Sequence, residues 1–536
     1  MDKVIKGALA ALLAVGLAGC ATHQQVVDNR LTLPQKLDAR EGAFVVKLVG
    51  VQPLSAFNAK WKSVKLLDVR TGRRTELMDT AALGAGYSLF MGSLPEGEYQ
   101  VTGLESIGAG PGTFGVIPAL IIAGMTSDSQ SLQKSLGTFR IQAGTLTNLG
   151  LIVSALPEEK GQPMKLAVMG DAAAQASALA NVEPRARERL AAMPSTGWPA
   201  PPDGAAAQQA EKIVREHARN ISTMEATPDG RILIGSALGM VHTRGTDGRW
   251  SSSSVGGLDN ITYVRALADG RIFAATDAGS YFVGSPQQRQ WTRHDFTSVD
   301  SRVTHLEPLG EHGFALLTAS MHQPNFAQPA TSRLYVKRTL EEAGPGREVL
   351  SLKDFSAMGR LPVFYNGVEL QVYFNHVGVS RTADLYRIDP ATLDKRMEKA
   401  DFWATEIYRL SGQDVVMHRM NGMTIYSSFS SDGGRTWRHE KTGADPYSMR
   451  FVGTGRAYGF VVKGRGWSTN AMGMVVSTDG GAKWRDTGVP VEGEGLMPIR
   501  LVDGRLFVMT SRKLVSTADE GRTWTTEWPL RPEGSR

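Results

Sequence analysis

The sequence Ser430-Ser431-Asp432-Gly433-Gly434-Arg435-Thr436-Trp437 recurs in related form twice more before the C-terminus. The second copy is Ser477-Thr478-Asp479-Gly480-Gly481-Ala482-Lys483-Trp484, and the third is Thr517-Ala518-Asp519-Glu520-Gly521-Arg522-Thr523-Trp524. Each octapeptide follows a short run of strand-forming residues, and its Asp and Gly residues supply turn chemistry. The Trp then opens the next strand with a large apolar face. We therefore expect each copy to be a hairpin turn whose Trp packs between neighbouring sheets.

The spacing of these copies indicates a repeat. The three tryptophans are 47 and 40 residues apart, and weaker copies over 246–250 and 285–291 end in tryptophans 41 residues apart. A period of about 40–50 residues is typical of propeller blades. The Asp-Gly-Arg turns at 229–231, 269–271 and 503–505 each join two strand-like runs, which is a hairpin signal. Each unit thus predicts one four-stranded blade.

We count seven units, with six or eight as the alternatives. The third and fourth have no recognisable octapeptide and are inferred from the length of the gap and from strand-like runs at 333–336 and 368–374. The predicted units centre on residues 219–255, 260–297, 302–353, 360–402, 404–442, 446–489 and 495–530. The sequence therefore predicts a mainly β protein with a C-terminal β-propeller over residues 219–536.

The octapeptide pattern S/T-x-D-x-G-x-T/K-W resembles the Asp box, or BNR repeat, of sialidase-like β-propellers. In that family the box lies on outer turns, away from the mouth of the central channel where ligands bind. The resemblance therefore implies a structural role for Ser430, Asp432, Gly434, Trp437, Ser477, Asp479, Gly481, Trp484, Asp519, Gly521 and Trp524.

The resemblance does not extend to a sialidase active site. The first substrate-binding arginine of that family usually lies in an R-I-P motif near the start of the propeller. The nearest match here, Arg360-Leu361-Pro362, falls in the middle. We interpret the proximity of Tyr408 to Glu406, and of Tyr365 to Glu369, as chance. We assign no catalytic residues.

Other chemistries find no better support in the sequence. The ten histidines form no metal-binding motif, and no nucleophile elbow or phosphate loop occurs, so we expect neither metal nor cofactor. The net charge of +6 is spread along the chain, which argues against nucleic acid. We favour a non-catalytic binding or assembly module with a protein or glycan partner. The alternative is a diverged sialidase-like glycoside hydrolase, whose chemistry requires a pair of carboxyl groups.

The N-terminal residues predict a targeting segment. Lys3 and Lys6 precede an apolar run over 7–16 that is too short to span a bilayer. Leu17-Ala18-Gly19-Cys20 then resembles the lipobox of bacterial lipoproteins, and Cys20 is the chain's only cysteine. The resemblance implies a signal peptide over 1–19 and lipidation of Cys20, palmitate included. Because Ala21 is not the inner-membrane retention residue, it implies an outer-membrane protein facing the periplasm or cell surface.

Three further regions separate this anchor from the propeller. Residues 20–40 are polar and predict a tether, and residues 41–170 predict a small β-sandwich. Within it, the run Leu94–Val101 resembles a strand of transthyretin-like sandwiches, and 138–141 with 149–153 predict a hairpin. The apolar run 116–125 is either packed on the sandwich or an exposed contact patch. Residues 171–218 predict a partly helical linker.

Overall fold

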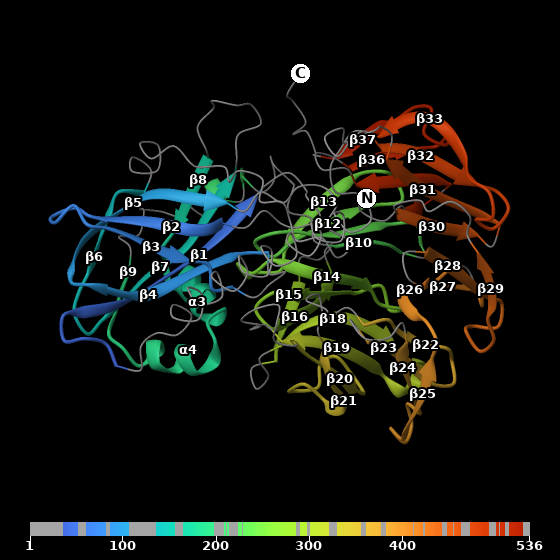
Figure 1. Cartoon of the computed structure of the whole chain (residues 1–536), viewed down its shortest axis with the longest axis horizontal. Coiled ribbons are helices and arrows are strands. Elements are labelled where there is room, and N and C mark those ends of the chain that lie inside the picture. The colour runs from blue at the N-terminus through green and yellow to red at the C-terminus, as the bar shows by residue number, and fades with distance from the viewer. Residues whose placement is uncertain are drawn as a thin grey trace, which may run out of the picture. The chain divides into compact units, whose positions relative to one another are not determined.

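The computed structural model divides the chain into two compact units, which are described separately (Figure 1). The first comprises residues 1–50, 57–81 and 87–213, and the second comprises 51–56, 82–86 and 214–536. The residues described are 36–51, 61–81, 86–106, 136–155, 165–197, 208–210, 212–213, 223–227, 229–285, 290–296, 301–320, 330–354, 361–376, 382–410, 412–421, 424–441, 448–453, 455–462, 472–491, 500–502, 504–509 and 514–528. The predicted signal peptide, Cys20 and the apolar run 116–125 lie outside these ranges.

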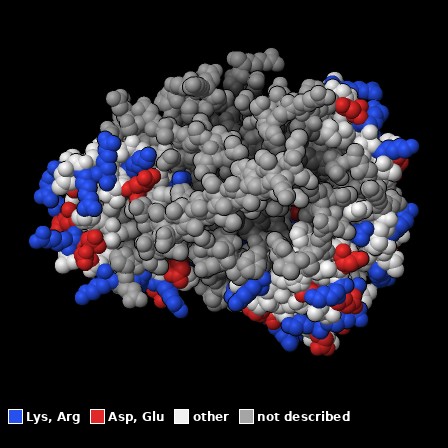
Figure 2. Space-filling model, in the orientation of Figure 1, with Lys and Arg blue, Asp and Glu red and all other residues white. Residues whose placement is uncertain are grey.

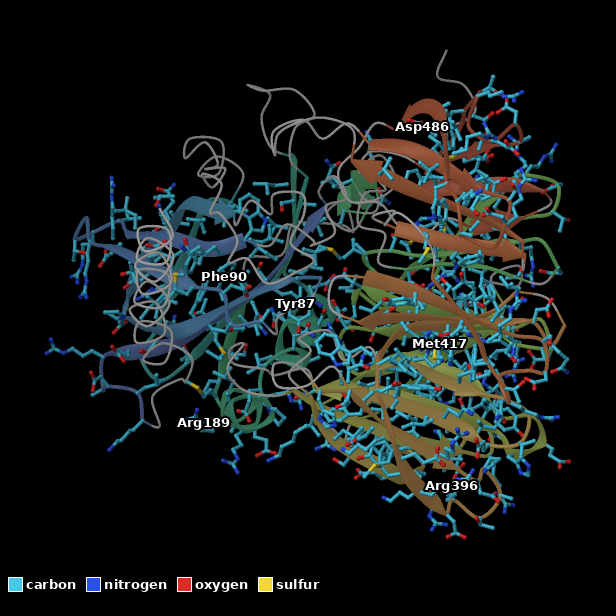
Figure 3. The ribbon with its side chains drawn as sticks, turned by 45° about the vertical axis from the view of Figure 1, so that its right-hand side comes forward. Tyr87, Phe90, Arg189, Arg396, Met417 and Asp486 are labelled. Atoms are coloured by element: carbon cyan, nitrogen blue, oxygen red, sulfur yellow. The ribbon has the colours of Figure 1, made fainter. Side chains whose placement is uncertain are left out.

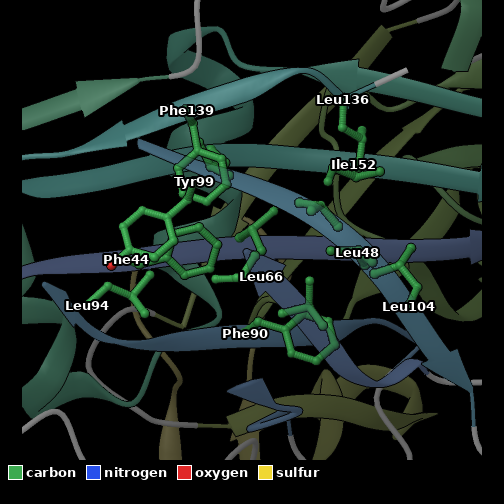
Figure 4. Close-up of a cluster of buried hydrophobic side chains, with 14 of the residues drawn as sticks. Phe44, Leu48, Leu66, Phe90, Leu94, Tyr99, Leu104, Leu136, Phe139 and Ile152 are labelled. Carbon is green, nitrogen blue, oxygen red and sulfur yellow. The ribbon is translucent and has the colours of Figure 1, made fainter. Parts of the chain in front are cut away.

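The first unit is a sandwich of two sheets. One sheet has the order β4-β1-β7-β8, and the other has the order β3-β2-β5-β6. Their strands are β1 (Glu41–Val51), β2 (Trp61–Asp68), β3 (Arg74–Met78), β4 (Ser88–Pro95), β5 (Gly97–Ser106), β6 (Thr138–Ile141), β7 (Leu146–Ala155) and β8 (Lys165–Met169). Apolar side chains from both sheets meet in one core, including Phe44, Phe90, Leu66, Tyr99 and Ile152 (Figure 4).

The chain changes sheet between β4 and β5, because β4 pairs with β1 while β5 pairs with β2. The Tyr99 hydroxyl donates a hydrogen bond to the Pro95 carbonyl at 2.9 Å and fixes this crossing. The Tyr99 ring stacks on Phe139, with centroids 6.1 Å apart. The run Leu94–Val101 therefore connects the two layers of the sandwich.

The predicted hairpin over 138–153 is wrong. β6 pairs with β5 in one sheet, whereas β7 lies beside β1 and β8 in the other. The short turn at Ala143-Gly144, where Gly144 has a φ of +70°, again crosses between layers. Local turn chemistry does not distinguish such a crossing from a hairpin, because both reverse the chain.

Residues 172–197, predicted as part of a linker, fold onto this sandwich. Helix α3 (Ala172–Ala180) begins at Asp171, whose side chain accepts a hydrogen bond from the Ala174 amide. Asn148 of β7 donates to the Gln175 carbonyl of this helix at 3.0 Å. Helix α4 (Pro184–Ala191) follows, and β9 (Ser195–Gly197) pairs in parallel with β7. The small Ala174 and Ala178 side chains are fully buried and allow this close approach.

Among the described residues, the second unit contains seven four-stranded antiparallel sheets, each built from four consecutive strands. We number them 1 to 7 in chain order. Sheets 1 to 3 comprise β10 (Thr223–Ala226), β11 (Ile232–Gly235), β12 (Met240–Arg244), β13 (Trp250–Ser254); β14 (Ile261–Ala266), β15 (Ile272–Thr276), β16 (Ser280–Ser285), β17 (Gln290–Asp295); and β18 (Ser301–Pro308), β19 (Phe314–Ser320), β20 (Ala330–Lys337), β21 (Arg347–Asp354), with a 3₁₀ turn at Gly310–His312.

Sheets 4 to 7 comprise β22 (Val363–Tyr365), β23 (Leu370–Asn375), β24 (Ala383–Ile388), β25 (Lys395–Ala400); β26 (Trp403–Arg409), β27 (Val415–Asn421), β28 (Thr424–Ser430), β29 (Arg438–Lys441); β30 (Ser448–Gly453), β31 (Arg456–Val462), β32 (Met472–Ser477), β33 (Arg485–Val491); and β34 (Arg500–Val502), β35 (Arg505–Met509), β36 (Leu514–Thr517), β37 (Thr525–Trp528). This is a β-propeller, and the predicted mainly β fold is confirmed.

Apolar clusters join each sheet to the next. A further cluster joins the last sheet to the first, through Phe507 and Leu514 on one side and Met224 and Ile234 on the other. The first strands also contact one another, in the pairs β10 with β14, β14 with β18, β18 with β22, β22 with β26, β30 with β34, and β34 with β10. Radially arranged sheets approach most closely near their common axis, so the first strands are the innermost.

Among the described residues, side chains alone close this ring. The described strands of sheet 1 all come from residues 223–254, and those of sheet 7 all come from residues 500–528, so no exchanged strand is seen between the two ends in the described part of the propeller. Arg244 Nε lies 3.2 Å from Glu527 Oε2, and both side chains keep about a tenth of their surface exposed (10% and 9%). Ser516 donates to the other Glu527 oxygen at 2.6 Å. The Arg244 guanidinium also covers the Phe507 ring at 5.0 Å.

We predict that Glu527→Gln weakens ring closure because it leaves Arg244 buried without a counter-charge. Breaking one side of a buried ion pair typically costs about 3–5 kcal/mol. The free energy of unfolding, measured by urea denaturation, should fall by this order. The matched control is Asp295→Asn, which breaks an exposed pair with Arg293 and should change stability by less than about 1 kcal/mol. Equal effects of the two variants would contradict the role assigned to this seam.

Candidate functional site

The octapeptide turns connect the third and fourth strands of sheets 5, 6 and 7. In the first, the Ser430 hydroxyl donates to Asp432 Oδ1 at 2.7 Å and accepts from the Gly434 amide at 2.7 Å. Asp432 also accepts from the Thr436 amide at 2.9 Å and from the Thr436 hydroxyl at 2.6 Å. Every oxygen of this carboxylate is therefore used inside its own turn.

The other two turns repeat this geometry. Asp479 accepts from the Ser477 hydroxyl at 2.8 Å and from the Lys483 amide at 2.9 Å. Asp519 accepts from the Thr517 hydroxyl at 2.8 Å and from the Thr523 amide at 2.9 Å. These hydrogen bonds stabilise the ionised form. The pKa of Asp432 is lowered chiefly by the Thr436 hydroxyl, that of Asp479 by the Lys483 amide, and that of Asp519 to about 2 by the Thr523 hydroxyl.

The second glycine position of each turn is left-handed, and at Gly434 and Gly521 it is also tightly enclosed. Gly434 and Gly481 have φ of +89°, and Gly521 has +87°. A Cβ at Gly434 would lie 2.7 Å from the Phe364 ring of sheet 4 and 3.3 Å from Trp437. A Cβ at Gly521 would lie 2.6 Å from Met474 of sheet 6. The glycine therefore allows both the turn and the approach of the preceding sheet.

Each octapeptide Trp packs against the preceding sheet. Trp437 joins the cluster of sheets 4 and 5, Trp484 that of sheets 5 and 6, and Trp524 that of sheets 6 and 7. Trp291 does the same for sheets 1 and 2, where its Nε1 donates to Ser253 at 3.0 Å. Trp250 occupies the closing cluster of sheets 7 and 1.

Sheets 3 and 4 use leucines in this place, which the sequence did not reveal. Leu340, 1% exposed, packs into the cluster of sheets 2 and 3, and its carbonyl accepts from the Tyr281 hydroxyl at 2.6 Å. Leu393, at φ +65°, packs against the cluster of sheets 3 and 4. Asp389 holds the turn before it by accepting from the Ala391 and Thr392 amides. In sheet 4 the leucine still follows a carboxylate turn, whereas in sheet 3 Leu340 follows Lys337-Arg338-Thr339 and no carboxylate precedes it.

A second group of polar residues lies on the innermost strands, and we call it the axial network: Glu225, Tyr263, Arg265, His305 and Glu307. Arg265 of sheet 2 contacts a carboxylate on each side, with Nε 3.7 Å from Glu225 of sheet 1 and Nη2 3.9 Å from Glu307 of sheet 3. Burial alone would lower the pKa of Arg265, but Tyr263, Glu225 and Glu307 raise it above its usual value. The guanidinium therefore remains charged.

Glu307 is the most buried carboxylate of this network, with 7% of its side chain exposed. Its Oε1 accepts from the Tyr365 amide of sheet 4 at 2.9 Å, and its Oε2 lies 3.4 Å from His305 Nε2. Burial would raise the pKa of Glu307, but His305, the charge of Arg265 and the Tyr365 amide together lower it. Glu307 is thus an anion that ties sheets 2, 3 and 4 together.

Polar contacts between innermost strands continue into sheets 5 and 6. Arg409 donates to the Tyr365 carbonyl at 2.5 Å and covers the Phe364 ring at 4.7 Å. Arg450 of sheet 6 pairs with Glu406 of sheet 5 and lies 3.8 Å above the Tyr408 ring. The Tyr408 hydroxyl contacts His418 Nε2 at 3.2 Å. Burial lowers the pKa of His418 to about 4, so this imidazole is neutral at pH 7.

Two Tyr–Glu pairs are close together in the sequence, and the structure brings only one of them together. Glu406 and Tyr408 are brought together, by Arg450. Tyr365 and Glu369 are not, because Glu369 pairs instead with Arg387 and Arg396 of the outer strands. Figure 3 shows Arg396 at the outer edge of the propeller and Met417 within it. Sequence reasoning missed the axial network, although Glu225 and Arg265 both stand four residues before an Asp-Gly-Arg turn.

Within the described ranges, no group of three or more His, Cys, Asp or Glu side chains is arranged to hold a metal ion. None of the helices in those ranges has the length and apolar character that a membrane span requires. On the face seen in Figure 2, the coloured basic and acidic side chains of both units are interspersed.

No protein-family model matches the chain, and no curated protein matches it. Among solved structures, the β-propeller domain of the Trilobed protease from Pyrococcus furiosus is similar at 10% identity and a TM-score of 0.36, over 57% of this chain and 98% of that one. BamB from Moraxella catarrhalis is similar at 10% identity and a TM-score of 0.31, over 55% and 95%. The WD40 propeller domain of Doa1 is similar at 10% identity and a TM-score of 0.36, over 56% of this chain and 92% of that one. These similarities are too distant to bear on function.

We predict that Gly434→Ala destabilises the propeller by about 1–3 kcal/mol, because the added methyl meets the Phe364 ring in a left-handed turn. Two controls separate these causes. Gly488→Ala has a φ of +78° but open space, so it reports backbone strain alone. Gly453→Ala has neither problem and should be neutral. Urea denaturation should rank the losses in that order, and a Gly434→Ala effect no larger than that of Gly488→Ala would contradict the packing role.

We predict that Glu307→Gln destabilises the propeller by about 2 kcal/mol, the scale of hydrogen bonds to a charged group. Because the folded-state pKa of Glu307 is lowered, its contribution is complete above the unfolded pKa of about 4.5. It is lost as the pH falls through the lowered value, so the gap between wild type and variant should close in acid. The control is Glu311→Gln, whose side chain is 90% exposed. A gap that is independent of pH would contradict this account.

Proposed function

We propose that this protein is a non-catalytic binding or assembly module, tethered to the outer membrane through lipidated Cys20. Its octapeptides are Asp boxes, and its propeller presents loops to a protein or glycan partner in the cell envelope. Lipobox-like Leu17-Ala18-Gly19-Cys20 supports the anchor. The turns support the structural reading of the boxes, because their carboxylates are used within the turns themselves.

The contacts that occupy both oxygens of Glu307 are the observation that carries the non-catalytic interpretation. Glycoside hydrolysis requires one carboxyl group that holds a proton near neutral pH, which enzymes achieve by raising its pKa. The pKa of Glu307 is lowered instead. Its oxygens already contact Tyr365, His305 and Arg265. A carboxylate in this state stabilises an assembly better than it donates a proton.

One observation favours the hydrolase alternative. Glu225 and Glu307 both contact Arg265 near the axis. A pair of carboxyl groups is what glycosidase catalysis requires. The two readings differ in what Glu307→Gln does. The alternative requires release of reducing sugar from envelope glycans by the purified wild-type chain, and loss of that release in Glu307→Gln. The binding hypothesis predicts that neither the wild-type chain nor Glu307→Gln releases reducing sugar.

We predict that Cys20→Ser abolishes both metabolic labelling with a clickable palmitate analogue and sedimentation with membranes. Acyl chains supply the attachment, because a lipid chain adds about 0.8 kcal/mol per buried methylene. The control is Ala21→Ser, which keeps the acceptor thiol and should remain labelled and membrane-bound. Membrane sedimentation of Cys20→Ser at the wild-type level would overturn the anchor.

The binding reading itself is tested by crosslinking in intact cells that express the full chain with a C-terminal tag. A specific envelope protein or glycan should be recovered from wild-type membranes, and not from membranes that lack the tagged chain. Cys20→Ser should reduce the yield, because the module is no longer concentrated at the membrane. Absence of any specific partner, together with sugar release that depends on Glu307, would replace this proposal by the alternative.

A further inference from the structure

Arg419 differs from four other arginines that are largely buried in the propeller. Arg244, Arg265, Arg387 and Arg450 each lie within 4.0 Å of a carboxylate. Arg419 forms no ion pair or hydrogen bond with any residue in the described part of the chain. Its Nε is buried without a hydrogen-bond acceptor. A buried charged group without such partners costs stability, so its presence needs a reason.

Two aromatic rings hold the Arg419 guanidinium. The Phe402 ring centroid lies 4.8 Å from its central carbon, and the Tyr426 centroid lies 6.0 Å from it. Arg419 pairs with Ala404 across β26 and with Tyr426 across β28, which places all three on the face of sheet 5 that meets sheet 4. On this face Met417, Phe402 and Trp437 form the apolar cluster with Tyr373 and Leu385 of sheet 4. Arg419 thus stands where that cluster ends.

The site lies at one defined end of the propeller. Arg419 is two residues before the end of β27, and Phe402 immediately precedes β26. The octapeptide turn of the same sheet, over 430–437, follows the opposite end of β28. The axial network lies at the C-terminal ends of the first strands, whereas Arg419 pairs with Ala404 near the start of the first strand of its sheet. Arg419 is therefore separate from both groups of residues described above.

The local charges suit a monoanion. Burial lowers the pKa of Arg419, and Asp401 partly offsets this without forming an ion pair. Burial and the charge of Arg419 lower the pKa of His439, whose Nδ1 contacts the Ser428 hydroxyl at 2.8 Å. The site thus offers one positive charge beside the negative charge of Asp401. Asp401 repels any anion that approaches Arg419, and this repulsion is twice as large for a doubly charged phosphate as for a singly charged carboxylate, so the site favours the carboxylate.

We propose that Arg419, flanked by Phe402 and Tyr426, is the anchor point for a carboxylate side chain of a protein partner. Rings near the guanidinium leave its planar edge as the route for an acceptor, and that edge matches a carboxylate in two-pronged geometry. Arginine and tyrosine are the residue types that dominate binding hot spots. This inference rests on the proposed binding function and names the part of the propeller and the chemistry of its partner.

The first test is stability, because a structural and a binding role predict opposite results. Arg419→Met keeps the apolar stem between the two rings and removes a charge that has no ion-pair partner among the described residues. We expect an unchanged or raised midpoint of thermal unfolding. Arg450→Met, which removes an arginine paired with Glu406, should lower it. A loss in Arg419→Met as large as that in Arg450→Met would show a structural role and overturn the proposal.

The second test is binding of an acetylated hexaglutamate peptide to the detergent-solubilised full chain, with hexaglutamine as the uncharged comparison. Arg419→Met should weaken hexaglutamate binding by about 30-fold, the effect of removing a hot-spot arginine. Arg396→Met, at an exposed arginine of the outer strand, is the control for general charge and should bind as wild type. Absence of wild-type binding, equal weakening by both variants, or stronger competition by inorganic phosphate than by acetate would each overturn the proposal.

The crosslinking experiment separates this inference from the function on which it rests. If wild type captures a partner and Arg419→Met captures it equally, the binding module stands and the anchor point is wrong. If capture fails in Arg419→Met and persists in Arg396→Met, the anchor point is supported. If wild type captures nothing, the proposed function fails first.

Discussion

The propeller depends on one contact that recurs at every boundary between sheets. A large apolar side chain, at the start of the outermost strand or in the turn before it, packs against the preceding sheet. Tryptophan makes this contact in sheets 1, 2, 5, 6 and 7, and leucine makes it in sheets 3 and 4. A four-stranded sheet cannot bury its own faces, so each gains stability only from its neighbours. In sheets 1, 4, 5, 6 and 7 a carboxylate turn fixes the backbone from which this side chain projects.

Charged groups supply a second level of organisation at the axis and at the seam. Buried ion pairs contribute little net stability, because removing charges from water is unfavourable. Their effect is to disfavour alternatives, since a misaligned sheet would leave Arg265, Glu307 or Arg244 without a counter-charge. Such a role suits this ring, because the described residues of sheet 1 and sheet 7 are joined by side chains and not by an exchanged strand. Arg419 has no such ion-pair partner among the described residues, and we interpret it as part of a binding site.

The amount of this structure that the sequence predicts follows from how local each interaction is. Octapeptides and Asp-Gly-Arg turns are encoded within a few residues, so the sheets lie close to the predicted units even where no octapeptide remains. The leucine wedges and the axial network join residues from different units, such as Glu225, Arg265 and Glu307, and only the closed ring makes them neighbours. The hairpin over 138–153 failed for the same reason, since the choice of sheet is a tertiary matter.

The central claim is that each wedge holds its sheet against the one before it, and native-state hydrogen exchange of Trp484→Ala tests it most directly. Trp484 packs between sheets 5 and 6. The account predicts that amides of β28 and β32 exchange about a hundredfold faster than in wild type, equivalent to a local loss of about 3 kcal/mol. Amides of β15 in sheet 2 should keep wild-type protection. Unchanged exchange in β28, or equal acceleration in β15, would contradict the claim.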